Sequence, residues 1–318
     1  MTRTPARRTR TRLSTAALAC AGLALSAACA GQPARQAAAP QQQAEPHVVP
    51  VSISGGPAVT KVLTVVLENH GTQSATAGMP KLATLARTYG HTSHYRGVTH
   101  PSLPNYLAMA GGSTSSVTDD ASPSRHPLHG SSVFDAALAQ GRTARVYAEA
   151  MPSPCAQSPS GRYAVKHNPW AYYRDATPAK QCAHGDVPLG TRTAGALHDD
   201  VARGTLPTVG MVVPDLCHDG HDCSLATADA WLAGWTDAVK AGPDWKAGRL
   251  ALVVTWDESE TNRDNTVLTV VATPRLHQAV TSAALTHLSW SRWMTDLVGA
   301  PPLRQAASAT SLGAAFRL

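Results

Sequence analysis

A serine between two prolines is the residue around which the chemistry of this chain can be organised. Ser102 is flanked by Pro101 and Pro104, and an apolar run that could begin a helix, 106–110, follows it. Because proline restricts the backbone, we expect a stiff, extended segment at Ser102, with Asn105 as the helix N-cap. Unpaired N–H groups at a helix N-terminus suit a phosphate. We therefore predict that Ser102 attacks a phosphate ester; the alternative is a surface serine in a proline-rich turn.

Polar side chains follow two apolar runs, 61–67 and 250–255, which are typical of buried strands in a parallel sheet. The side chains in question are Glu68, Asn69, Asp257 and Glu258. Open α/β sheets bind ligands at the carboxyl ends of their strands, so we expect these groups to converge. Their oxygens suit a divalent cation (Ca²⁺, Mg²⁺, Mn²⁺ or Zn²⁺), which would lower the pKa of the Ser102 hydroxyl. We predict one such ion and leave a second open.

A third apolar run, 208–213, leads into a segment that is dense in metal-binding side chains, 215–223. Asp215, His221 and the more distant His287 offer oxygen and nitrogen atoms that could hold a second metal ion or hydrogen-bond a phosphate. A competing interpretation is a metal site formed by Cys217, His218, His221 and Cys223. Glu149, after the predicted strand 144–150, is expected to be a solvated strand end; the alternative is a functional role.

The long segment 151–205 is rich in proline and glycine and is predicted to be irregular. Within it, residues 166–173 place a lysine, a histidine and an amide beside aromatic rings, a combination that could form one wall of a substrate site. His167 is therefore predicted to bind substrate, and so are His100, Asn105 and Asp215. The alternative is a packed loop that a disulfide holds in place.

Strands and helices alternate along the chain, which predicts an α/β fold with a mostly parallel sheet between helices. A further strand is predicted at 266–272. Helices are predicted at 79–89, 132–140, 224–240 and 277–298.

Composition divides the 318 residues into three parts. Residues 1–30 are predicted to be an export signal, 31–57 a linker rich in Ala, Gln and Pro, and 58–318 a single domain. The chain has 27 Lys and Arg against 21 Asp and Glu, but much of the positive charge precedes residue 36. The remainder is close to neutral, so we predict no nucleic-acid partner, and we expect a monomer.

The export signal has more than one interpretation. A basic region is followed by the apolar run 13–28, which is too short for a comfortable membrane span. The residues around Cys29 fit cleavage between small side chains, or lipidation of Cys29 as in a lipoprotein; Arg7 and Arg8 also permit a twin-arginine signal. A lipid at Cys29 would be the only membrane attachment that we expect, and the protein is predicted to be exported.

The remaining cysteines agree with export, because an even number in an exported chain favours disulfides. Cys217 and Cys223 enclose a tight loop and are predicted to pair. That pairing leaves Cys155 with Cys182.

Several segments together resemble the phosphoesterase family of bacterial and fungal acid phosphatases and phospholipases C, within the alkaline-phosphatase superfamily. They are VVLENHG (65–71), THPSLPNYLAMAGGST (99–114), VPDLCHDGHDCSLATADAWL (213–232), VVTWDESE (253–260) and THLSWSRWMTDLVGAPPL (286–303). The resemblance implies a three-layer sandwich and a nucleophile at Ser102 that also touches the metal. It implies His221 and His287 near the phosphate, and Asp215 less directly. It assigns the metal to Glu68, Asn69, Asp257 and Glu258.

The predicted activity is an exported, metal-dependent, acid-phosphatase-like phosphomonoesterase. Ser102 would attack phosphorus, His221 would protonate the leaving alcohol, and water would then hydrolyse the phosphoserine. A phospholipase C or another phosphodiesterase is the nearest alternative, although the chain lacks the C-terminal β domains of many large phospholipases C. A sulfatase is disfavoured because Tyr106 stands where sulfatases have arginine. A non-catalytic exported binding lipoprotein would leave Ser102 and the paired acids without a role.

Overall fold

The computed structural model describes residues 54–173, 179–261 and 264–318, which fall within one compact unit. The predicted export signal, Cys29 and residues 31–53 of the predicted linker lie outside the described residues. No helix in the described ranges is long and apolar enough to cross a membrane.

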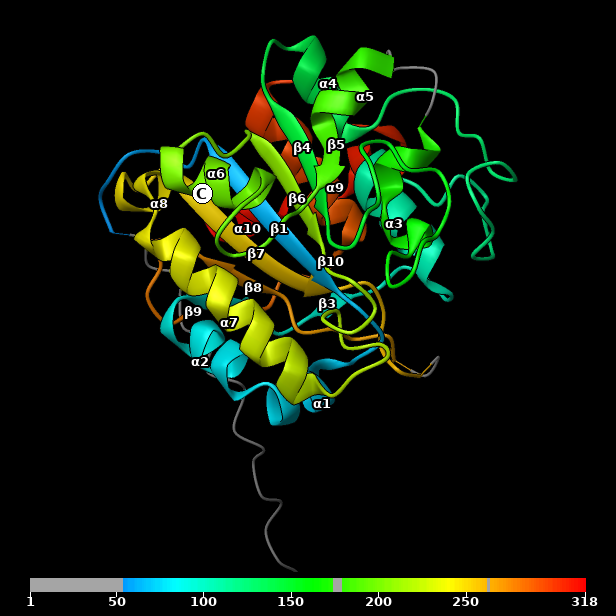
Figure 1. Cartoon of the computed structure of the whole chain (residues 1–318). Coiled ribbons are helices and arrows are strands. Elements are labelled where there is room, and N and C mark those ends of the chain that lie inside the picture. The colour runs from blue at the N-terminus through cyan, green and yellow to red at the C-terminus, as the bar shows by residue number, and fades with distance from the viewer. Residues whose placement is uncertain (1–53, 174–178, 262–263) are drawn as a thin grey trace, which may run out of the picture. The chain divides into compact units, whose positions relative to one another are not determined.

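A central sheet runs in the order β5-β4-β6-β1-β7-β8-β2-β9 (Figure 1). The strands are β1 (Lys61–Leu67), β2 (Gly90–Thr92), β3 (Tyr95–Arg96), β4 (Ala144–Ala148), β5 (Asp186–Pro188), β6 (Val209–Val213), β7 (Leu250–Trp256), β8 (Val270–Ala272), β9 (Ala279–Thr281) and β10 (Leu285–Thr286). The pairs from β5 to β7 are parallel, and β8 is antiparallel to its neighbours β7 and β2. A separate pair joins β3 to β10. The prediction of a mostly parallel sheet is confirmed.

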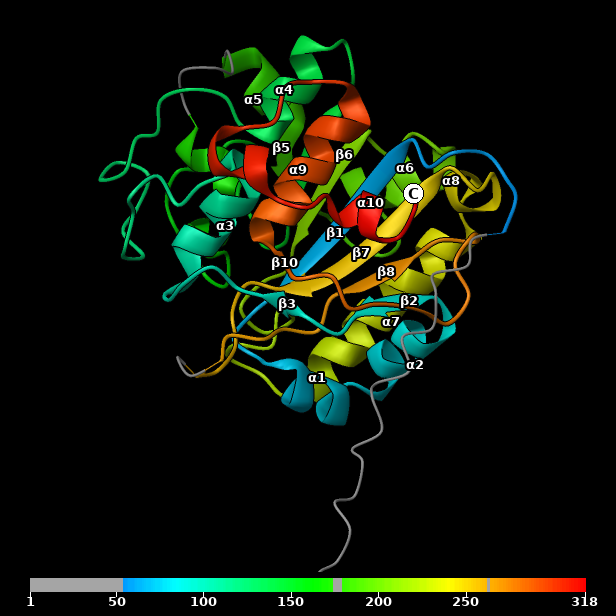
Figure 2. The same ribbon diagram turned by 180° about the vertical axis from the view of Figure 1, so that it is seen from behind.

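Helices cover both faces of this sheet. They are α1 (Thr72–Gly78), α2 (Pro80–Thr88), α3 (Ser102–Gly111), α4 (Val133–Ala139), α5 (Ala179–Gly185), α6 (Ala196–Arg203), α7 (Leu225–Ala241), α8 (Pro243–Lys246), α9 (His287–Val298) and α10 (Leu312–Ala315), with 3₁₀ turns η1 (Val165–His167), η2 (Pro169–Tyr172) and η3 (Arg304–Ser308). The helices α1, α2, α6, α7 and α8 lie on one face (Figure 1), and α3, α4, α9 and α10 lie on the other (Figure 2). The expected three-layer α/β sandwich is therefore confirmed.

The register of the central strands brings the functional segments together. β1 and β7 are buried along almost their whole length, and Leu67 pairs with Trp256 in the parallel register. The two strands therefore end side by side, so the carboxylates that follow them, Glu68 and Asp257, start from the same edge of the sheet. Trp290 of α9 donates a hydrogen bond from its indole to Thr64 of β1 at 2.8 Å, which ties the rear layer to the central strand.

Other predicted elements are confirmed in type and approximate position. The strands at 144–150, 208–213 and 250–255 and the helices at 79–89, 132–140 and 224–240 correspond to β4, β6, β7, α2, α4 and α7. Two of these helices begin where a serine caps them. Ser132 accepts a hydrogen bond from the Asp135 N–H, and Ser224 accepts one from the Thr227 N–H.

The C-terminal prediction of one helix over 277–298 is wrong in its first half. Residues 279–281 form β9 at the edge of the sheet, and α9 begins only after Thr286, which caps it by accepting a hydrogen bond from the Leu288 N–H. The β9 residues pair in parallel with β2, a strand nearly two hundred residues earlier, and local periodicity carries no information about such a partner. The predicted strand 266–272 is also shorter, because only Val270–Ala272 pairs with β7.

The prediction that 151–205 is irregular is wrong in part. The segment contains η1, η2, α5, β5 and α6, and its strand β5 pairs with β4 at the edge of the sheet. Each of these elements is short, so each depends on tertiary packing rather than on local propensity. The other described residues of the segment lie in turns, bends and isolated bridges, so this part of the prediction is confirmed.

Candidate active site

Ser102 is the first residue of α3, and its side chain is buried. Its hydroxyl donates a hydrogen bond of 2.6 Å to Oε1 of Glu68, the residue that follows β1. The Lys166 ammonium in turn donates to the Ser102 oxygen at 3.4 Å. The structure therefore joins the predicted nucleophile to a carboxylate and a cation from two distant segments.

The predicted cap of α3 is wrong, because Pro101 occupies the N-cap position and Asn105 lies inside the first turns. The Asn105 side chain is fully buried and tied to the segment before the helix. Its oxygen accepts hydrogen bonds from the backbone N–H groups of Val98 and Thr99 at 2.8 and 3.1 Å. Its amide nitrogen donates to the Thr99 carbonyl and to Glu258. Asn105 thus holds the approach to Ser102 in place.

Glu68 and Asp257 form a buried acidic pair beside Ser102. Both side chains are fully buried, and neither Oε2 of Glu68 nor Oδ2 of Asp257 has a hydrogen-bond partner. Burial and the charge of Glu68 raise the pKa of Asp257 well above its usual range. Burial would also raise the pKa of Glu68, but the positive charges of His167 and Lys166 hold it well below its usual range. A cation between the two carboxylates would satisfy both free oxygens.

The other two predicted metal ligands make different contacts. Asn69 adopts a left-handed backbone with φ 59°, and its N–H donates to Oδ1 of Asp257 at 3.1 Å. Glu258 accepts a hydrogen bond from Asn105 at 3.0 Å and lies 3.2 Å from Nδ1 of His100. Burial and the charge of Glu68 raise the pKa of Glu258 to about 8, and burial lowers the pKa of His100.

His167 is fully buried between two carboxylates. Its Nε2 lies 3.1 Å from Oε1 of Glu68, and its Nδ1 lies 3.4 Å from Oδ2 of Asp219. Burial opposes a charge on the imidazole, but Glu68 and Asp219 raise the pKa of His167 to about 9. Its ring stacks on Tyr106 of α3 with centroids 5.1 Å apart. His167 is therefore an imidazolium that balances part of the acidic charge.

The two histidines predicted near the phosphate lie in different surroundings. His287 is fully buried, and both of its nitrogens are engaged: Nε2 donates to the Asp257 carbonyl at 2.5 Å, and Nδ1 accepts from the Tyr95 hydroxyl at 3.2 Å. Burial lowers its pKa to about 4, so the ring is neutral. His221 is partly exposed, and its Nδ1 pairs with Asp222 at 2.7 Å. Its backbone N–H donates to Asp219, which links it to the site through His167.

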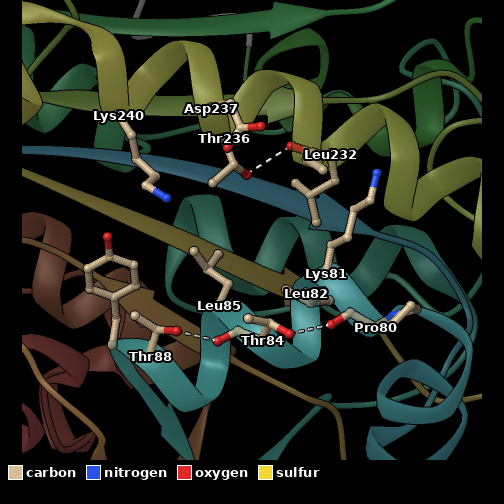
Figure 3. Close-up of a pocket in the computed structure, with 12 residues that line it drawn as sticks. Pro80, Lys81, Leu82, Thr84, Leu85, Thr88, Leu232, Thr236, Asp237 and Lys240 are labelled. Carbon is tan, nitrogen blue, oxygen red and sulfur yellow. Dashed lines mark hydrogen bonds between the residues drawn. The ribbon is translucent and has the colours of Figure 1, made fainter.

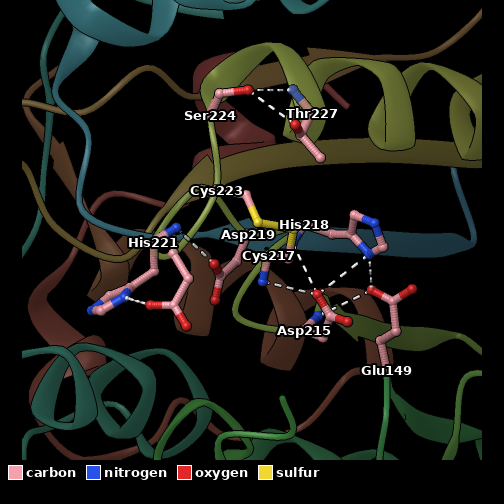
Figure 4. Close-up of a disulfide and its surroundings, with 10 residues drawn as sticks. Glu149, Asp215, Cys217, His218, Asp219, His221, Cys223, Ser224 and Thr227 are labelled. Carbon is pink, nitrogen blue, oxygen red and sulfur yellow. Dashed lines mark hydrogen bonds and ion pairs between the residues drawn. A yellow bond between two sulfur atoms is a disulfide. The ribbon is translucent and has the colours of Figure 1, made fainter.

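Asp215 belongs to a second cluster, at the ends of β4 and β6 (Figure 4). Among the described residues, Glu149, Asp215 and His218 form a compact group of three potential metal ligands, with one ligand atom of each within 4.8 Å of the others. Nδ1 of His218 lies 2.9 Å from Glu149 and 3.3 Å from Asp215. The indole of Trp231 donates to the other oxygen of Glu149 at 3.0 Å. Glu149 is therefore a partnered group, and its prediction as a solvated strand end is wrong.

The predicted disulfides are present. Cys217 pairs with Cys223, with Cα atoms 4.6 Å apart, and Cys155 pairs with Cys182, with Cα atoms 5.9 Å apart. The first bond closes the loop that carries Asp219 and His221 (Figure 4). Because these sulfur atoms are bonded to one another, the alternative metal site that included Cys217 and Cys223 is excluded.

A groove of about 420 Å³ lies between α2 and α7, on the face of the sheet opposite α3 (Figure 3). Leucines, threonines and aliphatic stems line it, and its charged residues are Lys81, Asp237 and Lys240. It contains no histidine and no pair of acids, so it offers no catalytic chemistry comparable with that at Ser102.

The fold and this site place the chain in a known class. The sequence model of the Phosphoesterase family matches residues 62–281, and the chain belongs to this family. It is a hydrolase that acts on phosphoric esters. The matched range includes Ser102, Glu68 and Asp257 and ends before α9.

Particular relatives agree with this class. A phosphatidylinositol-3-phosphatase of Mycobacterium tuberculosis is 29% identical over 269 residues, which cover 82% of this chain and 84% of that protein. A probable acid phosphatase of Kluyveromyces lactis is 28% identical over 220 residues, which cover 66% of this chain and 50% of the yeast protein. The chain thus spans about half the length of that fungal relative. An alkaline-phosphatase-superfamily protein from Vibrio parahaemolyticus shares the fold, with a TM-score of 0.53 at 10% identity over 84% of this chain and 74% of that chain.

Sequence reasoning missed Asp120, and it included Lys166 and Asp219 only as members of a possible substrate wall and of a ligand-rich segment. Lys166 and Asp219 lie in segments that the sequence did single out, beside His167 and within 215–223. Asp120 lies between α3 and α4 without a surrounding motif. Its oxygens accept hydrogen bonds from Lys166 and from the Leu103 N–H, contacts that only the tertiary structure reveals.

Proposed function

We propose that this protein is an exported, metal-dependent phosphomonoesterase that acts through a phosphoserine on Ser102. The observation that carries the proposal is the hydrogen bond from Ser102 to Glu68, within a buried acidic pair that has free oxygens. A buried hydroxyl with a carboxylate on one side and an ammonium on the other is suited to attack an anionic ester. The disulfides agree with an oxidising compartment.

The residues present fit a divalent cation. Glu68 and Asp257 supply hard oxygen ligands, and their unpartnered oxygens would be costly to bury without a positive partner. Ser102 would be a third ligand, and Asn69 and Glu258 lie beside the pair. The bound ion would lower the pKa of the Ser102 hydroxyl and neutralise charge on the phosphoryl group.

The side chains then have distinct tasks. Glu68 orients the Ser102 hydroxyl, and the hydroxyl proton leaves along this hydrogen bond as the oxygen attacks phosphorus. The bond between phosphorus and the leaving oxygen breaks, and the alcohol takes a proton from an acid, for which His221 is the candidate. Water then attacks the phosphoserine, which releases phosphate and restores the Ser102 hydroxyl. Lys166 lies where it can stabilise the charge on the phosphoryl oxygens.

The remaining predicted residues act by positioning. His287 holds the Asp257 main chain with a neutral ring, and Asn105 holds Glu258. His100 lies against Glu258, and His167 balances the charge of Glu68 and Asp219. Asp215 caps the segment before His218 by accepting two backbone hydrogen bonds.

The substrate is proposed to be a phosphate monoester. One relative is named a phosphatidylinositol-3-phosphatase, so a lipid headgroup monoester belongs in the substrate panel. A phospholipase C activity is the alternative from the same family. Assays of p-nitrophenyl phosphate, phosphatidylinositol 3-phosphate, a phosphodiester and phosphatidylcholine in parallel distinguish these; faster turnover of either diester contradicts a monoesterase.

Ser102→Ala tests the nucleophile. We expect a loss of at least about 10³-fold in kcat for p-nitrophenyl phosphate, because the variant lacks the hydroxyl that is held against Glu68 and would form the phosphoenzyme. Thermal unfolding should be close to that of the wild type, since only one oxygen is removed. Ser93→Ala is the matched control, because the Ser93 hydroxyl contacts His94 and Thr281 instead of the site. Wild-type turnover by Ser102→Ala contradicts the proposal, as does the absence of a trapped phosphoserine in acid-quenched wild type.

A further inference from the structure

The carboxylate of Asp120 bridges two hydrogen-bond donors next to Ser102. Its Oδ1 accepts from the Leu103 N–H at 2.9 Å, and its Oδ2 accepts from the Lys166 ammonium at 2.9 Å. Leu103 is the second residue of α3, and its N–H belongs to the first turn, which has no partner within the helix. The Asp120 carboxylate therefore occupies a position in which these two donors could otherwise bind an anionic ligand.

The same two donors suit the non-bridging oxygens of a phosphoryl group on Ser102. Lys166 lies 3.4 Å from the Ser102 oxygen, and the Leu103 N–H follows Ser102 directly in the chain. A phosphorus atom bonded to that oxygen would carry its free oxygens into the space between these donors. A carboxylate with two oxygens bridging them is the nearest equivalent of phosphate that a side chain can offer.

The negative charge of the neighbouring acids makes it unfavourable for the Asp120 carboxylate to stay in place once a phosphate binds. The buried acids Glu68 and Asp257 already lie beside Ser102, and Asp219 lies on the other side of the His167 ring. Within the described residues the cationic partners that contact Glu68 are Lys166 and His167. A phosphate dianion and the Asp120 carboxylate cannot both accept from Lys166 without strong mutual repulsion. One of the two anions must leave.

Asp120 is able to leave. Its side chain is about one-third exposed, and it lies between α3 and α4, outside any helix or strand. Among the described residues, its hydrogen-bond donors are Lys166 and the Leu103 N–H, so turning to solvent breaks these two hydrogen bonds and leaves the hydrogen bonds within the sheet and within α3 intact.

We propose that Asp120 is a built-in competitor of the phosphoryl group, which holds Lys166 and the Leu103 N–H until a phosphate ester or inorganic phosphate displaces it. This inference rests on the proposed function, because it assumes that phosphate binds at Ser102. Its consequence is that removing the Asp120 charge strengthens phosphate binding. If Asp120 served only to position Lys166, removing its charge would weaken phosphate binding.

Isothermal titration of inorganic phosphate into the metal-loaded wild-type protein and into Asp120→Asn tests this inference. We expect Asp120→Asn to bind phosphate about tenfold more tightly, because one charge-assisted hydrogen bond no longer has to be broken. Asp120→Ala should do the same, which guards against an effect of the new amide. Lys166→Met should bind phosphate more weakly than the wild type.

Asp119→Asn is the matched control. It removes the same charge one residue away, where the side chain accepts from the Ala121 N–H and pairs with His126 rather than Lys166. We expect its phosphate affinity to equal that of the wild type. Unchanged or weaker binding by both Asp120 variants overturns the inference while leaving the proposed function intact. If the wild type neither hydrolyses p-nitrophenyl phosphate nor binds phosphate, the proposed function fails and the inference fails with it.

Discussion

Two clusters of acids and histidine lie at the carboxyl ends of the central strands, and they differ in how their charges are satisfied. Around Ser102, Glu68 and Asp257 are fully buried and each has an oxygen without a hydrogen-bond donor. In the second cluster, Glu149 is held by Trp231 and by backbone and imidazole donors, and His218 is partly exposed. The ligand atoms of the second cluster lie close together, but its acids already have hydrogen-bond and ion-pair partners.

The difference shows that closely spaced ligand atoms do not by themselves favour metal binding; unpartnered buried carboxylates do. A compact set of partnered side chains is stable as it is, so a cation there would have to compete with existing hydrogen bonds. Buried carboxylate oxygens without donors carry an electrostatic cost that a cation removes. We therefore expect the site at Ser102 to be the functional metal centre and the cluster of Glu149, Asp215 and His218 to be structural.

The largest expected effect is a loss of activity and of bound metal when the acids at Ser102 are changed, with no such loss when the acids of the second cluster are changed. Glu68→Gln and Asp257→Asn should each lower kcat/KM for p-nitrophenyl phosphate by about 10²–10³-fold, because each removes a carboxylate that would hold the cation at the reacting phosphoryl group. Both should also lose metal, measured by elemental analysis after dialysis. Glu149→Gln and Asp215→Asn, the matched changes in the second cluster, should retain activity within about threefold and keep the metal. If Glu149→Gln and Asp215→Asn lost metal while Glu68→Gln and Asp257→Asn kept it, the second cluster would be the metal centre.

A smaller effect concerns the pH dependence of stability of the metal-free protein. His167 has a pKa of about 9 in the folded protein, against 6.5 as the ordinary value. A raised imidazole pKa stabilises the folded state fully below about pH 6.5, and this stabilisation is lost as the pH rises through about 9. Its size is at most about 3 kcal/mol in the free energy of unfolding.

Urea unfolding in EDTA at several pH values between 6 and 10 measures this contribution. The difference in the free energy of unfolding between wild type and His167→Gln should shrink as the pH rises, because the wild type alone loses the imidazolium. A difference that is constant with pH would show that His167 is neutral in the folded protein.

The smallest expected effect is in the second cluster. His218 is partly exposed, so its contacts with Glu149 and Asp215 are screened by solvent. His218→Gln should lower the free energy of unfolding by no more than about 1 kcal/mol at pH 7, measured by urea unfolding. Glutamine keeps a donor that can reach Glu149. A loss as large as that of His167→Gln would show that the two clusters are energetically alike.

Sequence patterns were sufficient wherever the structure is set by local, repeated features. The apolar runs of β1, β6 and β7 identified the buried strands, and the rule that ligands bind at strand ends placed Glu68 and Asp257 together. The cysteine spacing predicted both disulfides. Helix signals failed at 277–286, where short strands exist only because a distant edge is available for pairing.

The chain by itself determined the class of fold, the acids at the strand ends and the serine beside a helix start, because each depends on residue type and near neighbours. Only the tertiary structure decided what those groups contact. It placed Lys166 against Ser102 and Asp120 against Lys166. It also showed that Asn105 donates a hydrogen bond to Glu258 and that His287 donates one to the Asp257 carbonyl. The physical reason is that hydrogen-bond partners between distant loops depend on strand register and helix packing, which no local spacing encodes.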